Sequence, residues 1–153
     1  IEFPTLLDDP SPQLLAYPRY TMVSEKFETM VRLGMANSRM KDLYDVWLMS
    51  RLFEFEGQTL CDAIRNTFRR RSTLLPSGLP TAFTEEFRKD AQKQMQWQAF
   101  VRKSKPEDIS GDLASVIIDL EAFLMPAIET SEGGKPFCML WPPNGPWNKR
   151  IMD

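Results

Sequence analysis

YPRYTMVSEKFETMVRLGMANSRMKDLYDVWLMS, residues 17–50, predicts two helices that meet at a short break, and the rest of the fold is organised around them. From Thr21 onwards, apolar residues recur at the spacing that gives a helix one buried face: Val23, Phe27, Met30, Val31 and Gly34. Gly34 and Asn37 favour a left-handed helix end, so they predict the break. The hydroxyl of Ser38 is then expected to cap the start of the second helix.

The second helix is expected to carry two carboxylates beside its buried face. Asp42 and Asp45 are three residues apart and therefore share one side of the helix. Its core side is expected to consist of Met40, Leu43, Val46 and Trp47. Carboxylates are rarely buried without a partner, and Lys26 and Lys41 are the nearest candidates. One interpretation is an ordinary helix ion pair between Lys41 and Asp45, which contributes about 0.3–0.5 kcal/mol; the other is a functional site.

Three motifs of this stretch follow one another along the chain: Tyr17-Pro-Arg, Glu25-Lys26-Phe27 and Arg39-x-Lys41-Asp42-x-x-Asp45. Two further motifs extend the pattern over nearly the whole chain: Phe3-Pro-Thr-Leu-Leu-Asp8 and Trp141-Pro-Pro-Asn-Gly-Pro-Trp147. Together they resemble the nucleotidyl transferase AbiEii/AbiGii toxin family. In that family the Glu-Lys pair belongs to the third sequence motif and the Arg-x-Lys-Asp pattern to the fourth.

The resemblance implies roles for five charged residues of these two motifs. Lys26 is expected to contact the nucleotide and, together with Asp42, to be catalytic. Arg39 and Lys41 are expected to help bind the nucleotide, with Asp45 in support, although Lys41 and Asp45 suit a structural ion pair equally well. The resemblance also implies transfer of a nucleoside monophosphate from an NTP to an acceptor such as tRNA, Mg²⁺ as cofactor, and a cognate antitoxin.

The metal-binding half of that family has no counterpart in this sequence. In the family, a Gly-Ser turn and an Asp-x-Asp pair precede the third motif and hold the metal ions. No Gly-Ser precedes Lys26 here, and Asp8 and Asp9 are adjacent rather than alternating. We therefore expect the chain to be the C-terminal helical portion of such a protein, the partner of an N-terminal nucleotidyltransferase lobe. Alone, it is expected to contain no metal ligands, to bind neither Mg²⁺ nor NTP, and to be inactive.

Composition restricts the chemistry further. The chain of 153 residues has no His and only two Cys, Cys61 and Cys138, which excludes Ser-His and Cys-His nucleophile pairs and a structural zinc site. Lone thiols and the absence of any signal-like or membrane-spanning apolar run predict a cytoplasmic protein that does not enter the membrane. The net charge of −2 does not indicate a general nucleic-acid binder.

Two other functions stay open at this point. One is a non-catalytic helical interaction module that binds a protein partner. The other is an RNA-docking domain that uses two basic segments, Arg69–Arg71 and Arg102–Lys105. Arginine binds phosphate through two parallel hydrogen bonds, but an arginine triplet is also favourable at the negative carboxyl end of a helix dipole.

The predicted fold is mainly α, a bundle of about five helices over residues 20–132. It lies between an extended N-terminal arm, residues 1–19, and an extended tail rich in Pro and Trp, residues 133–153, which packs on the helices. After the first two helices, further ones are expected at about these residues: 57–71, from 84, 90–104 and 112–129. The proline-rich arm is expected to hold a short strand at 13–17, whose unpaired edge predicts a homodimer.

Overall fold

The computed structural model describes residues 12–106 and 111–149 of the chain, and the side chains of 18–106, 111–130 and 134–149. Within these ranges the chain is mainly helical, which confirms the predicted fold class. The α-helices are α1 Pro12–Leu33, α2 Met40–Leu52, α3 Gly57–Arg70, α4 Glu85–Lys89, α5 Ala91–Ser104 and α6 Leu113–Gly133. Two 3₁₀ turns and three short strands complete the described part: Gly34–Ala36, Thr81–Phe83, β1 Phe55–Glu56, β2 Met139–Trp141 and β3 Asn148–Lys149.

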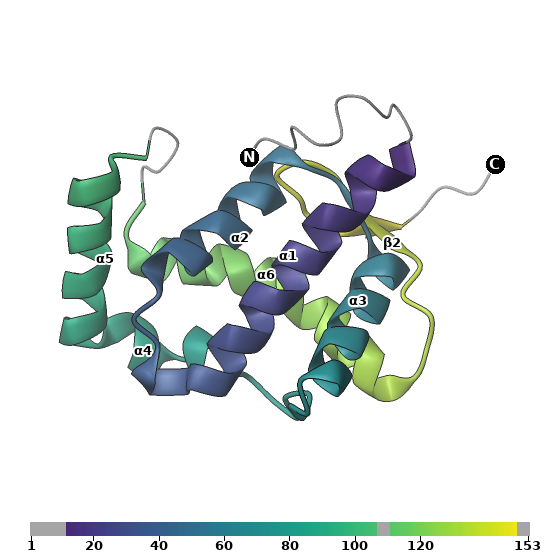
Figure 1. Ribbon diagram of the computed structural model, residues 1–153, viewed down its shortest axis with the longest axis horizontal. Coiled ribbons are helices and arrows are strands. Elements are labelled where there is room, and N and C mark those ends of the chain that lie inside the picture. Colours follow the sequence, from purple (N-terminus) through teal and green to yellow (C-terminus); the bar gives the residue numbers. More distant parts are fainter. Residues whose placement is uncertain (1–11, 107–110, 150–153) are drawn as a thin grey trace.

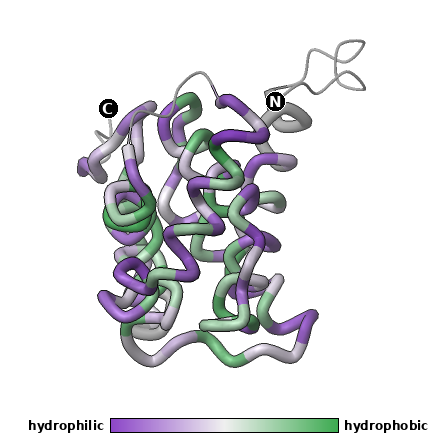
Figure 2. Tube along the Cα trace, turned by 90° about the vertical axis from the view of Figure 1, so that its left-hand side faces the viewer, coloured by the Kyte–Doolittle hydropathy of each residue, from purple (hydrophilic) through white to green (hydrophobic). Residues whose placement is uncertain are grey.

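The helices pack around α6, which runs behind α1 and α2 in Figure 1, with α3 on one side and α5 at the far end beside α2. Hydrophobic and hydrophilic stretches alternate along the helices (Figure 2), as expected when each helix buries one face. The predicted apolar stripe of the last helix is confirmed, since each of these side chains is at most 1 % exposed: Leu113, Val116, Ile117, Leu120, Phe123, Leu124 and Ile128. No helix in the described ranges combines the length and apolar character needed to cross a membrane.

The N-terminal arm is where the prediction was wrong. Residues 13–17 are helical, not a strand, because α1 begins at Pro12 and continues through Pro18. Pro12 is the first helical residue, where a missing N–H costs nothing, whereas Pro18 removes a helix hydrogen bond. Tertiary contacts next to it offset that cost. Arg19 Nε donates to the Glu54 carbonyl at 2.9 Å, and the hydroxyl of the buried Tyr20 accepts the Glu56 N–H at 2.6 Å.

This correction has a consequence for the predicted homodimer. A helix has no unpaired strand edge, so pairing of two arms through residues 13–17 loses its basis. Residues 1–11, the rest of the predicted arm, lie outside the described residues.

The C-terminal tail packs on the helices, and it forms a sheet that was not predicted. β2 pairs antiparallel with β1, Phe55 opposite Trp141, and β3 pairs antiparallel with β2. The Trp141 indole donates to the Ser50 carbonyl at 2.7 Å, and the Trp147 indole donates to the Phe123 carbonyl at 2.9 Å. These bonds fix the tail over the carboxyl end of α2 and the middle of α6.

A buried carboxylate joins α1 to the end of α3. The Glu28 side chain is fully buried and accepts hydrogen bonds from Thr73 Oγ1 at 2.6 Å, Arg71 Nη1 at 2.7 Å and Arg32 Nε at 3.1 Å. Arg70 pairs with Glu25 at 3.0 Å. Two members of the predicted arginine triplet therefore hold helices together within the protein.

Replacing this carboxylate tests its share of the stability. We expect Glu28→Gln to lower the free energy of unfolding at pH 7 by about 2 kcal/mol, because a neutral amide loses the charge-assisted bonds. Burial raises the pKa of Glu28, but the bonds from Thr73, Arg71 and Arg32 outweigh it, so the pKa is lowered overall. The stabilisation is therefore complete above the unfolded pKa of about 4.3 and is lost as the pH falls through the lower folded pKa.

Urea unfolding of the wild type and of Glu28→Gln, at neutral and acidic pH, measures this effect. The difference between the two proteins should shrink in acid. Glu85→Gln is the matched control, because the same chemical change then falls on a side chain that is 64 % exposed. An equal difference at both pH values would contradict a charge-dependent role for Glu28.

Candidate functional site

The junction between α1 and α2 positions the predicted site residues. Gly34 has a φ of +53°, the left-handed conformation predicted for it, and it ends α1. Asn37 does not share that conformation, since its φ is −71°. The expected Ser38 cap is also wrong. The N-cap of α2 is Arg39, and its own N–H donates to Asn37 Oδ1 at 2.9 Å, so the buried Asn37 side chain organises the turn instead.

All five charged residues singled out in the sequence come together in one ion-pair cluster. Lys26 of α1 lies between the two carboxylates of α2, with Nζ 3.0 Å from Asp42 Oδ1 and 3.1 Å from Asp45 Oδ2. Arg39 Nε donates to Asp42 Oδ2 at 2.6 Å, and Lys41 Nζ donates to Asp45 Oδ2 at 2.8 Å. The expected Lys41–Asp45 pair is thus present, as one part of this Lys26–Asp42 cluster.

The cluster is layered, with its carboxylates inside and its cations outside. The Asp42 and Asp45 side chains are 8 % and 10 % exposed, whereas those of Arg39 and Lys41 are 62 % and 74 % exposed. Lys26 is intermediate at 22 %. Three cations and two carboxylates leave one net positive charge, so an anion that approaches from solvent meets the cations first.

The ion pairs keep both central groups charged. Burial lowers the pKa of the Lys26 ammonium, but its hydrogen bonds to Asp42 and Asp45 raise it by more, so the pKa is raised overall. Burial raises the pKa of the Asp42 carboxyl, but the bonds from Arg39 and Lys26 outweigh it and lower that pKa. At neutral pH, Asp42 is therefore a carboxylate and a weak base.

The same geometry bears on metal binding. One oxygen of Asp42 is bonded to Lys26 and the other to Arg39, and a divalent cation at this place would face three positive side chains. Among the described residues, no group of three or more Cys, Asp or Glu is arranged to hold a metal ion. The cluster does not fit Mg²⁺.

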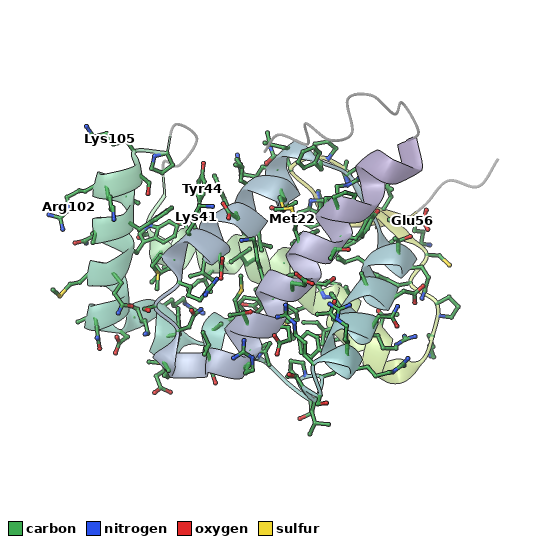
Figure 3. The ribbon with its side chains drawn as sticks, in the orientation of Figure 1. Met22, Lys41, Tyr44, Glu56, Arg102 and Lys105 are labelled. Atoms are coloured by element: carbon green, nitrogen blue, oxygen red, sulfur yellow. The ribbon has the colours of Figure 1, made fainter. Side chains whose placement is uncertain are left out.

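An open groove adjoins the cluster on the side of α5. It has a volume of about 500 Å³ and is lined by Ser38, Arg39, Met40, Lys41, Asp42, Gln96, Ala99, Phe100 and Lys103. Figure 3 shows Lys41 and Tyr44 on the side of α2 that faces α5. The ring of Tyr44 lies 5.6 Å from that of Phe100. One wall of the groove therefore comes from the cluster and the other from α5.

Sequence reasoning missed the residue that fixes this junction to α5. Lys93 is only 4 % exposed, and its Nζ donates to the Asn37 carbonyl at 2.8 Å. It lies four residues before the buried Trp97 and so on the same face of α5, which was the available signal. Through Asn37 and its bond to Arg39, Lys93 supports the turn that presents the cluster.

The comparisons with known proteins identify the family of the chain. The sequence profile described as nucleotidyl transferase AbiEii toxin, type IV toxin–antitoxin system, matches residues 1–126, a range that includes the whole Lys26–Asp42 cluster. The chain therefore belongs to the AbiEii family of nucleotidyl transferase toxins. No curated protein and no solved structure matches the chain.

Proposed function

We propose that this protein transfers a nucleoside monophosphate from an NTP to an acceptor such as tRNA, and that Lys26 and Asp42 are its catalytic residues. The observation that carries the proposal is the contact of 3.0 Å between Lys26 Nζ and Asp42 Oδ1. It joins a residue of the third family motif to one of the fourth across two helices. Membership of a nucleotidyl transferase toxin family supplies the reaction class.

The cations of the cluster suit phosphate binding. Lys26 carries a compact charge that neutralises a phosphate oxygen, and the exposed Arg39 guanidinium matches phosphate geometry with its fork of donors. Lys41 adds a third cation at the rim. Asp45 supports the site because it holds Lys26 and Lys41 at 3.1 and 2.8 Å.

Asp42 gains its activity only when the nucleotide arrives. With Lys26 and Arg39 bonded to it, its lowered pKa makes it a poor proton acceptor. A triphosphate competes for the same two cations. As they turn to the phosphates, the pKa of Asp42 rises and its carboxylate becomes a better base for the attacking hydroxyl group of the acceptor. The ion pairs of the free protein thus act as a resting state.

The metal ion that the family uses does not enter this account. Because the cluster does not fit Mg²⁺, we assign the metal to the Gly-Ser and Asp-x-Asp segment of an N-terminal lobe. The chain of 153 residues alone is accordingly expected to be inactive. A cognate antitoxin, a cytoplasmic location in a bacterium and a role in phage defence complete the proposal.

One experiment tests the reaction. The full-length protein, carrying the metal-binding segment, is incubated with Mg²⁺, tRNA and each radiolabelled NTP in turn, and the label on RNA is counted. Label from at least one NTP is expected, and no label from any of them would contradict the proposal. Label transferred by the 153-residue chain alone would contradict the assignment of the metal to another lobe.

The alternative is a non-catalytic helical interaction module. It is favoured by one observation, namely that every charge of the cluster already has a partner within the protein. Loss of partner binding in Lys26 variants, together with no transfer by the full-length protein, would support it.

A further inference from the structure

α5 differs from the other long helices in its charge. Residues Ala91–Ser104 contain no Asp or Glu, and the helix ends with Arg102 and Lys103, followed by Lys105. These three cations are exposed and form no ion pair with any residue in the described ranges. Figure 3 shows Arg102 and Lys105 pointing away from the rest of the molecule. Positive charge that has no ion-pair partner among the described residues therefore gathers at this end of α5.

The other basic segment has a different role. Arg70 and Arg71 are used in pairs with Glu25 and the buried Glu28. Residues 102–105 keep all three charges free of described carboxylates, whereas in residues 69–71 two of the three charges are paired.

Of these cations, Lys103 lines the groove between α2 and α5, together with the aromatic ring of Phe100. Phe100 is partly buried there, with its ring 5.6 Å from Tyr44 and 5.5 Å from Trp97. Lys103 stands on the same wall as Phe100, and Arg39 and Lys41 stand on the opposite wall. Among the described residues of the lining, the only carboxylate is Asp42, which is already bonded to Lys26 and Arg39. Cations that follow a backbone, combined with aromatic faces for bases, are the features that bind single-stranded nucleic acid.

We infer that this groove binds a single-stranded segment of the acceptor RNA and leads it to the Lys26–Asp42 cluster. The inference rests on the proposed function for the choice of RNA. Lys103 and Lys41 contact phosphates from opposite walls, and a base stacks against Phe100. The strand then ends beside Asp42, the group proposed to accept the proton of the attacking hydroxyl.

The test measures RNA binding rather than transfer. A fluorescein-labelled oligoadenylate RNA is titrated with the 153-residue chain, and its anisotropy is followed at several salt concentrations. Lys103→Glu should weaken binding by about tenfold or more and reduce the salt slope by about one, since a phosphate contact becomes a repulsion. Phe100→Leu keeps an apolar side chain in the groove but loses the stacking face, and should weaken binding about fivefold or more.

Lys135→Glu is the matched control, because Lys135 is exposed, undergoes the same change of charge and follows α6, whose carboxyl end lies on the side opposite α5 (Figure 1). It should leave the affinity almost unchanged. Circular dichroism confirms that each variant is folded. The inference is overturned if the wild type does not bind the RNA, if Lys135→Glu weakens binding as much as Lys103→Glu, or if polyglutamate displaces the RNA equally well, which would indicate an acidic protein partner.

The two proposals fail separately. If Lys103→Glu leaves the RNA affinity unchanged, the groove is not the RNA-binding site, but the proposed nucleotide transfer is unaffected. If RNA binding depends on the groove but the full-length protein transfers no nucleotide, the proposed function is wrong and the RNA-binding groove stands.

Discussion

We expect Lys26→Met and Asp42→Asn each to lower nucleotide transfer by the full-length protein at least about a hundredfold, because groups that stabilise charge at a reacting phosphate have effects of this size. Lys26→Met removes the cation placed between the two carboxylates. Asp42→Asn keeps the shape of the side chain but removes both its charge and its capacity to accept a proton. The measurement is transfer of a radiolabelled nucleotide to RNA, or growth arrest when the toxin is expressed.

Neither change should unfold the protein. In Asp42→Asn, Lys26 retains Asp45 as a partner at 3.1 Å, so no buried cation is left alone. Lys89→Met is the matched control, because that lysine is 68 % exposed and pairs with Glu85, outside the cluster and the groove lining. Its effect on transfer should be much smaller than that of Lys26→Met. If Lys26→Met and Asp42→Asn both keep wild-type transfer, the cluster is a salt-bridge network and no more.

We expect Trp141→Ala to lower the free energy of unfolding by about 3–5 kcal/mol, the usual range for a large aromatic residue removed from a core. The indole is 5 % exposed and packs with its ring centroid 4.9 Å from that of Phe123 and 5.4 Å from that of Trp147. Its N–H donates to the Ser50 carbonyl. Truncation therefore opens a cavity and leaves a carbonyl without this donor at the place where the tail joins the helices.

Chemical denaturation followed by circular dichroism measures this change. Leu74→Ala is the control, because Leu74 is a large apolar residue that is 90 % exposed, and it should change stability by less than about 0.5 kcal/mol. Equal stabilities for the two variants would contradict the view that the tail is part of the core.

The parts of the fold that sequence predicts best are those with long periodic patterns. The stripe of α6 and the buried face of α2 follow from apolar spacing alone, because a helix with one apolar face must bury it. The three-stranded sheet was missed because its strands have two or three residues, too few for an alternating pattern to be recognised. The first strand, at residues 55–56, is also far along the chain from the other two, at residues 139–149, and a local pattern cannot reveal such a pairing.

The beginning of α1 was missed for a different reason. Pro18 favours a helix boundary locally, but the contacts of Arg19 and Tyr20 with residues 54–56 hold the helix together around it. The residues of the candidate site likewise differ in whether a local sequence pattern marks them. Lys26, Arg39 and Asp42 were identified by their motifs, whereas Lys93 and Phe100 belong to a helix that folds back onto the junction and carries no motif.

The central claim is that the Lys26–Asp42 cluster gives up its cations to the phosphates of a nucleotide. Carbon-13 NMR of the Asp42 carboxyl in the full-length protein tests this most directly, through a pH titration with and without a bound non-hydrolysable NTP analogue. Without the nucleotide, the pKa of Asp42 should lie below its ordinary value, because Arg39 and Lys26 hold the carboxylate against the effect of burial. With the nucleotide bound, the account predicts that the pKa of Asp42 rises. A pKa that stays equally low when the nucleotide is bound would contradict it.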